Sequence, residues 1–94
     1  MTKTEIALKL AIQYSAIEDE MFSAMEKRDE LKKQDNLNEY QLDDLAWYRK
    51  EVRRLRSNMD TVQDTRHSLD ISDKMWYKAL TEAYKLNFPC EVTA

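Results

Sequence analysis

Residues 34–42 decide the fold of this chain, and they read Gln-Asp-Asn-Leu-Asn-Glu-Tyr-Gln-Leu. They form a short polar turn followed by a helix start signal, because Asn38 is a favourable N-cap residue and Gln41 can hydrogen-bond back to it. Apolar residues with helical spacing lie on both sides of this turn. A turn this short brings the chain back antiparallel, so the sequence predicts a long helical hairpin.

The lack of glycine supports the same fold. There is no glycine in the 94 residues, and the only proline is Pro89. Glycine supplies the positive φ of tight turns and the close approach of phosphate-binding loops. We therefore expect turns built on Asn and Asp, and no Gly-dependent nucleotide motif. Pro89 disfavours a helical residue before it, which ends the last helix near Asn87.

Two further start signals complete the helix assignment. Thr2 and Glu5 have the spacing of a capping box, and Ser72 followed by Asp73 is typical of a third helix start. The predicted helices cover about residues 3–34, 39–68 and 73–87, and residues 88–94 form a tail. The predicted fold is all-α and forms a single domain over 1–94. It is a long antiparallel helical hairpin with a short third helix packed over its open end, similar to a three-helix bundle.

Apolar stripes predict how the two long helices pair. The stripe of the first consists of Ala7, Leu10, Tyr14, Ile17, Met21, Ala24 and Leu31, and that of the second of Leu45, Tyr48, Val52, Leu55, Met59, Val62 and Leu69. Folding about the turn pairs positions whose numbers sum to about 73, so Ala24 faces Tyr48 and Leu31 faces Leu42. Arg66 falls within the second stripe, and we expect its stem to follow apolar surface while its charged head reaches water. An interface or ligand contact is the alternative.

The start of the first helix is apolar on more than one side, because Leu8 and Ile12 lie outside its stripe. The third helix follows the end of the second, which an antiparallel hairpin brings beside the start of the first. We therefore expect the third helix to cover this region and to bury Trp76 and Leu80.

Composition and charge exclude several classes of protein. Apolar residues make up 43% of the chain and charged residues 35%, with a net charge of −3. No segment as a whole is strongly basic, which argues against binding dominated by phosphate backbones. The single Cys90 is expected to be a free thiol. The uncharged run of residues 10–17 is too short to span a bilayer. We expect a cytoplasmic protein with no membrane contact.

The strongest local feature lies in the second helix, where residues 49–56 hold five basic side chains and one acidic side chain. Tyr40 and Trp47 are spaced i, i+7, and we expect them to face away from the apolar stripe together with the basic groups. The predicted binding residues are Tyr40, Trp47, Lys50, Arg53 and Arg54. Exposed aromatic rings beside Arg and Lys favour a protein–protein anchor. Stacking on a nucleotide and a solvated helix face are the alternatives.

An acidic cluster in the first helix raises a different hypothesis. The spacing of Glu26 and Asp29 resembles one half of the Mg²⁺ motif of MazG-type nucleotide pyrophosphohydrolases, which pair E-x-x-E on one helix with E-x-x-D on the next. The second helix offers no matching second motif on its inner face, and Glu18 would have to serve with the pair. His67 has no partner for a zinc site or a nucleophile–base pair. We assign no catalytic residue, no metal and no cofactor.

These observations predict a non-enzymatic helical module that binds another protein. It would act by occluding a partner, in the manner of the small inhibitors and sequestering proteins of mobile elements. The thin core and the exposed rings favour a homo-oligomer, a dimer or higher. Capture of a nucleotide or short nucleic acid by the Trp/Arg/Lys face at an oligomer interface is the first alternative. A Mg²⁺-dependent helical nucleotide hydrolase is the second.

Overall fold

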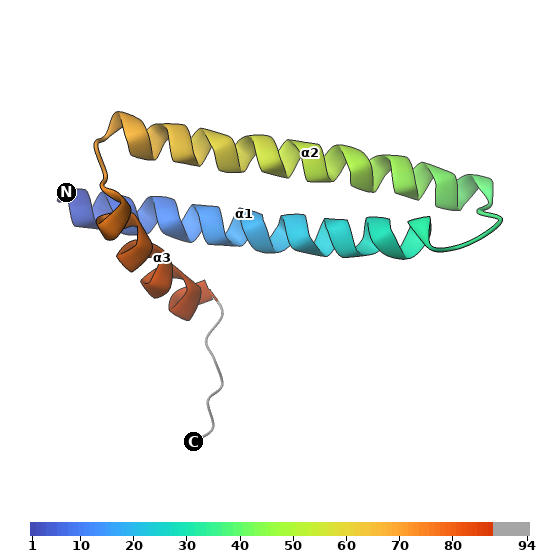
Figure 1. Cartoon of the computed structure of the whole chain (residues 1–94), viewed down its shortest axis with the longest axis horizontal. Helices are drawn as coiled ribbons and strands as arrows, with labels where there is room; N and C mark the ends of the chain where they lie inside the picture. Colours follow the sequence, from blue (N-terminus) through green and yellow to red (C-terminus); the bar gives the residue numbers. More distant parts are fainter. Residues whose placement is uncertain (88–94) are drawn as a thin grey trace, which may run out of the picture. The chain divides into compact units, whose positions relative to one another are not determined.

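The computed structural model describes residues 1–87, which are helical with no strand among them. Three helices follow one another: α1 covers Lys3–Lys32, α2 Glu39–Ser68 and α3 Asp73–Asn87 (Figure 1). α1 packs against α2 as a hairpin and also against α3, which confirms the predicted fold. The predicted bounds of the helices are confirmed except at the end of α1, which ends at Lys32 and not at residue 34. The predicted tail and Cys90 lie outside the described residues.

All three predicted helix starts are confirmed by their capping hydrogen bonds. The amide of Glu5 donates to Thr2 Oγ1 at 3.2 Å, and the amide of Met75 donates to Ser72 Oγ at 3.2 Å. At the start of α2 the cap is reciprocal: the amide of Gln41 donates to Asn38 Oδ1 at 2.9 Å, while the amide of Asn38 donates to Gln41 Oε1 at 3.0 Å. Each cap satisfies a backbone donor that the first helical turn leaves free.

Asn and Asp take the turn positions that glycine occupies in most proteins. Asn36 has φ 58° in the turn after α1, and Asp70 has φ 56° after α2. The amide of Ile71 donates to the Arg66 carbonyl, and the amide of Asp70 donates to the His67 carbonyl. This pair of bonds is a Schellman motif with Asp70 as the left-handed residue. It ends α2 and directs the chain into α3.

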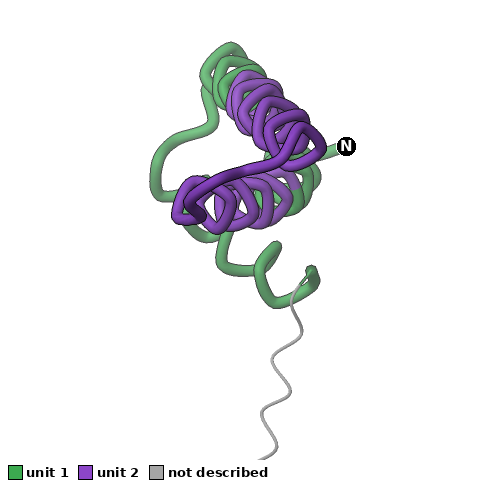
Figure 2. The backbone as a smooth tube through the Cα atoms, turned by 90° about the vertical axis from the view of Figure 1, so that its right-hand side faces the viewer, with its two compact units in different colours: residues 1–16, 60–94 green, residues 17–59 purple. Residues whose placement is uncertain are grey.

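The described chain divides into two units, shown in different colours in Figure 2. The hairpin unit, residues 17–59, contains the end of α1, the turn and most of α2. Its buried apolar residues are Met21, Ala24, Leu45, Val52, Leu55 and Met59. Leu45 is the buried residue near the turn, whereas Leu42 is 52% exposed, so the pairing of Leu42 with Leu31 stays a prediction. Two helices alone form this unit, so each leaves most of its circumference in water.

The three-helix unit contains residues 1–16 and the chain from residue 60 onward. It buries Ala7, Ala11 and Ser15 of α1, Val62 and Arg66 of α2, Ile71, and Trp76, Ala79 and Ala83 of α3. The prediction that α3 covers the start of α1 is therefore confirmed, and Trp76 is buried. The side chains that α1 and α3 bury are mostly small, which lets two helix backbones approach closely. Leu80 is only half-buried.

The last residue of α3 is fixed to α1 by hydrogen bonds. Asn87 Nδ2 donates to the Ile12 carbonyl at 3.0 Å and also to Ser15 Oγ. Ser15 is fully buried, and its hydroxyl donates to the same Ile12 carbonyl at 3.1 Å. These bonds satisfy buried polar atoms at the point where α3 ends.

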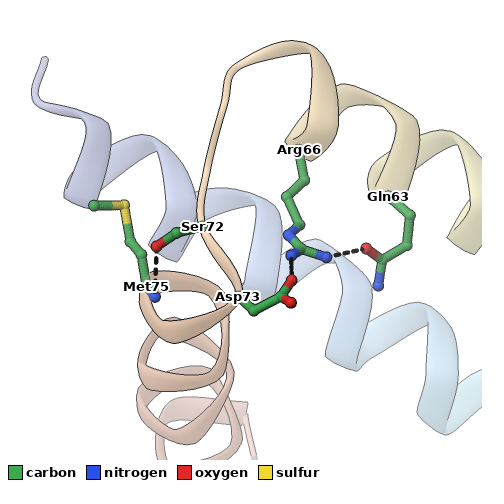
Figure 3. A network of polar contacts seen from close by, with 5 residues as sticks. All are labelled: Gln63, Arg66, Ser72, Asp73 and Met75. Atoms are coloured by element: carbon green, nitrogen blue, oxygen red, sulfur yellow. Dashed lines mark hydrogen bonds and ion pairs between the residues drawn. The ribbon is translucent and has the colours of Figure 1, made fainter.

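Arg66 does not extend its head to water as predicted. Only 6% of the residue is exposed, and its guanidinium lies 5.4 Å from the centroid of the Trp76 ring. It forms an ion pair with Asp73 and donates to Gln63 Oε1 at 3.0 Å (Figure 3). The ring of Trp76 also meets Tyr14 edge to face, with 5.7 Å between centroids. The first turn of α3 supplies both the counter-ion and the ring, so Arg66 joins α2 to α3.

Candidate functional site

The predicted binding face lies on α2 within the hairpin unit, and its two rings are exposed. Aromatic rings of this size can supply much of the binding energy of an interface. Tyr40 is 82% exposed and Trp47 is 56% exposed. Neither ring therefore belongs to the core of the hairpin unit. Lys50 and Arg53 are also exposed, and neither forms an ion pair within residues 1–87. These two basic groups are free to meet a partner.

Trp47 lies at the edge of the contact between α1 and α2, and not on the far side of α2 as predicted. Its ring meets Tyr48 edge to face, with 5.0 Å between centroids and an interplanar angle of 82°. Trp47, Tyr48 and Leu55 line one side of a shallow groove of about 320 Å³ in the hairpin unit, and Glu20 and Lys27 are among the α1 residues on the other side. Ala24 lines the same groove, which agrees with its predicted pairing with Tyr48.

Arg54 is held by a neighbour on its own helix. Its Nε and Nη2 donate to the two carboxylate oxygens of Glu51 at 2.9 and 2.8 Å. This hydrogen bonding from Arg54 lowers the pKa of Glu51, and the same bond raises the pKa of the Arg54 guanidinium. The Arg54 guanidinium must give up its two hydrogen bonds to the Glu51 carboxylate before it can bind a phosphate in the same bidentate way. The arrangement therefore weakens the nucleotide hypothesis for this face.

Two acidic residues lie between the exposed rings. Asp43 and Asp44 are three and four positions after Tyr40, so they share its side of α2 at helical spacing. Both are exposed, and neither forms an ion pair in the described part of the chain. The face that begins α2 thus presents two aromatic rings with two unpaired carboxylates between them. Sequence analysis assigned the two rings to this face and gave no binding role to Asp43 and Asp44.

The acidic cluster of α1 does not form a metal site by geometry. Asp29 accepts a hydrogen bond from Arg28 Nε at 3.1 Å. Residues 1–87 contain no group of three or more His, Cys, Asp or Glu side chains placed to hold a metal ion. His67 is exposed at the end of α2. The Mg²⁺ hypothesis therefore stays a prediction from spacing alone.

A second groove, which sequence reasoning did not predict, lies between α1 and α3 in the three-helix unit. It has a volume of about 340 Å³, and its apolar lining includes Leu8, Met75 and Ala79. The charged residues Lys74, Lys78 and Glu82 also line it. The signal in the sequence is weak, because Leu8 and Met75 are single apolar residues at the margins of the buried faces.

Comparison with protein-family models, curated proteins and solved structures found no match to this chain. Among the described helices, none combines the length and apolar character that crossing a membrane would require.

Proposed function

We propose that this protein is a non-enzymatic helical module that binds another protein through the start of α2, with Trp47 as its anchor. The observation that supports this proposal most is the exposure of Tyr40 and Trp47 on one side of a two-helix hairpin. Phe22 and Leu42, 55% and 52% exposed, belong to the same unit. Apolar side chains gathered on a thin structural unit favour burial by a partner. The module would act by occluding the surface that it binds.

The energy available from Trp47 is large enough for an anchor. A fully buried aromatic side chain hides roughly 150–250 Å². Slightly more than half of Trp47 remains exposed, so a partner can cover ~100 Å² more of it. At about 25 cal/mol per Å² this burial contributes ~2–3 kcal/mol, which is the range of interface hot spots.

The test compares Trp47→Ala with a matched variant at another exposed ring. Tyr77 serves as the control because it is 67% exposed on α3, outside the proposed face. Both proteins are assayed by analytical ultracentrifugation for self-association and by photo-crosslinking from Lys50 for partners in cells. We expect Trp47→Ala to weaken binding by about 30-fold, while Tyr77→Ala binds as the wild type does.

Circular dichroism should show unchanged helix content in both variants, because neither ring is buried in its unit. If Trp47→Ala retains both the native mass and the native crosslinks, the rings on α2 are only solvated surface and the proposal is wrong. A nucleotide that raises the melting temperature of the wild type but not of Trp47→Ala would also overturn it in favour of ligand capture.

A further inference from the structure

The groove between α1 and α3 has the chemistry of a docking site for a helix. Leu8, Met75 and Ala79 give it an apolar floor, and Figure 3 shows the Met75 side chain extending toward the start of α1. A volume of about 340 Å³ is at the low end of pockets that hold a small ligand. It is sufficient for one aromatic side chain.

The charge at one end of this groove is positive. Lys74 and Lys78 line it one helical turn apart, and neither forms an ion pair within the described residues. Glu82 also lines the groove, and its carboxylate is paired with Lys85 at 3.6 Å. The N-terminus of α3 lies at the same end, where Ser72 also lines the groove. Asp73 does not neutralise this end, because its carboxylate is committed to Arg66. The groove therefore favours an occupant that brings apolar side chains together with carboxylates.

The chain itself carries a segment of that kind. At the start of α2, Tyr40 and Trp47 are separated by two helical turns, with Asp43 and Asp44 between them. All four residues are exposed, and both carboxylates lack an ion-pair partner in residues 1–87. This segment complements the groove in charge, because its two unpaired carboxylates can meet two unpaired lysines. It also complements the groove in apolar character, because its exposed rings can meet the apolar lining.

We propose that the groove between α1 and α3 binds the start of α2 from a second copy of this chain. One aromatic ring of that segment enters the apolar groove, and Asp43 and Asp44 pair with Lys74 and Lys78 of the receiving copy. The inference rests on the proposed function, because it names the partner that the α2 face meets. The contact joins two different surfaces of the same chain, so the resulting assembly is heterologous and its size depends on whether the contacts close.

Charge reversal gives a test with an internal rescue. The variant Lys74→Glu/Lys78→Glu keeps its α2 face but makes its groove negative. The variant Asp43→Lys/Asp44→Lys keeps its groove but makes its α2 face positive. Within each variant, like charges then oppose one another, so self-association should weaken by at least ~10-fold relative to the wild type. When the two variants are mixed, opposite charges face one another in both kinds of contact, and association should recover.

A matched control excludes an effect of net charge alone. Lys32→Glu/Lys33→Glu changes the net charge by the same amount at exposed positions near the turn of the hairpin unit, and it should associate like the wild type. Sedimentation velocity measures the mass of each protein and of the mixture. The contact depends on exposed charges, so raising the salt from about 50 mM to about 500 mM should also weaken wild-type association.

Failure of this inference is separable from failure of the proposed function. If Trp47→Ala dissociates the protein while both charge-reversed variants associate normally, the α2 face binds elsewhere and only this inference is overturned. It is also overturned if the mixture does not recover, or if the wild type stays monomeric up to about 1 mM. In that last case the α2 face would bind a different protein. Recovery in the mixture also shows that both variants are folded.

Discussion

Replacing Arg66 tests whether α3 is held by charge or by packing. The guanidinium is buried, yet its counter-ion Asp73 has a side chain that is 81% exposed. The Nε of Arg66 has no hydrogen-bond acceptor. Burying a charge against a solvated carboxylate, with one donor unsatisfied, is a poor electrostatic arrangement. The stem of the side chain is buried with the rest of the residue, of which only 6% is exposed.

The opposing contributions can be compared directly. The bond to Gln63, the pair with Asp73 and the contact with the Trp76 ring are worth ~1 kcal/mol each. Desolvation of the guanidinium opposes them with a penalty of several kcal/mol. Arg66→Met removes the favourable contacts of the guanidinium together with its desolvation penalty, and it keeps an apolar side chain in place of the stem. The free energy of unfolding should therefore change by less than ~1 kcal/mol. Arg66→Ala also removes two buried methylenes at ~0.8 kcal/mol each and leaves a cavity, so we expect a loss of ~2–3 kcal/mol.

Thermal and urea unfolding followed by circular dichroism measure these differences. For a chain of this size, 1 kcal/mol corresponds to a shift of about 4–8 °C in melting temperature. Arg66→Ala should therefore melt roughly 10 °C or more below Arg66→Met. Asp73→Asn provides the control for the ion pair, and it should cost only about 1 kcal/mol because the carboxylate is already solvated.

Equal destabilisation of Arg66→Met and Arg66→Ala would refute this reasoning. It would show that the charge, and not the stem, holds α3 in place. A loss of 3 kcal/mol or more in Asp73→Asn would lead to the same conclusion, since that is about what removing one partner of a strongly coupled buried pair costs.

Three further predictions concern single contacts. Ala83 is fully buried where α3 meets α1, so Ala83→Leu should lower the free energy of unfolding by ~1–3 kcal/mol in urea titrations, and an unchanged value would place that face in solvent. Asp70 has positive φ, so Asp70→Gly should raise the melting temperature, corresponding to a gain of up to ~1 kcal/mol, whereas Asp70→Val should lower it. The hydrogen bond from Arg54 lowers the pKa of Glu51 in the folded state, so its stabilising effect is present above the ordinary value of 4.5 and is lost as the pH falls through the lowered pKa. An NMR titration should give Glu51 a pKa below 4.5, and the stability difference from Glu51→Gln should shrink on acidification.

The helices of this protein could be predicted closely because their signals are local. Thr2, Asn38 and Ser72 satisfy amide groups within three residues of themselves, so their sequence neighbours alone place the helix starts. The absence of glycine made Asn and Asp the turn residues, and Asn36 and Asp70 adopt the positive φ. The direction of the hairpin follows from the shortness of its turn.

The candidate site was predictable only in part. The exposure of Tyr40 followed from helical spacing, because it lies far from the apolar stripe on α2. Trp47 shares the side of α2 that carries Tyr40, because the two are spaced i, i+7, and the α1 side chains that line its groove decide how much of its ring is covered. The hydrogen bonding of Arg54 to both carboxylate oxygens of Glu51 depends on side-chain conformations that spacing does not specify.

Sequence by itself determined the order of the three described helices and placed their bounds to within two residues, because capping, turn chemistry and apolar periodicity act over a few residues. Tertiary structure alone decided that Arg66 is buried and that a groove lies between α1 and α3. Arg66 is buried because α3 places Asp73 and Trp76 against it, residues that lie seven and ten positions away along the chain. The groove beside Leu8 is lined by residues of both α1 and α3, so its shape depends on both helices at once.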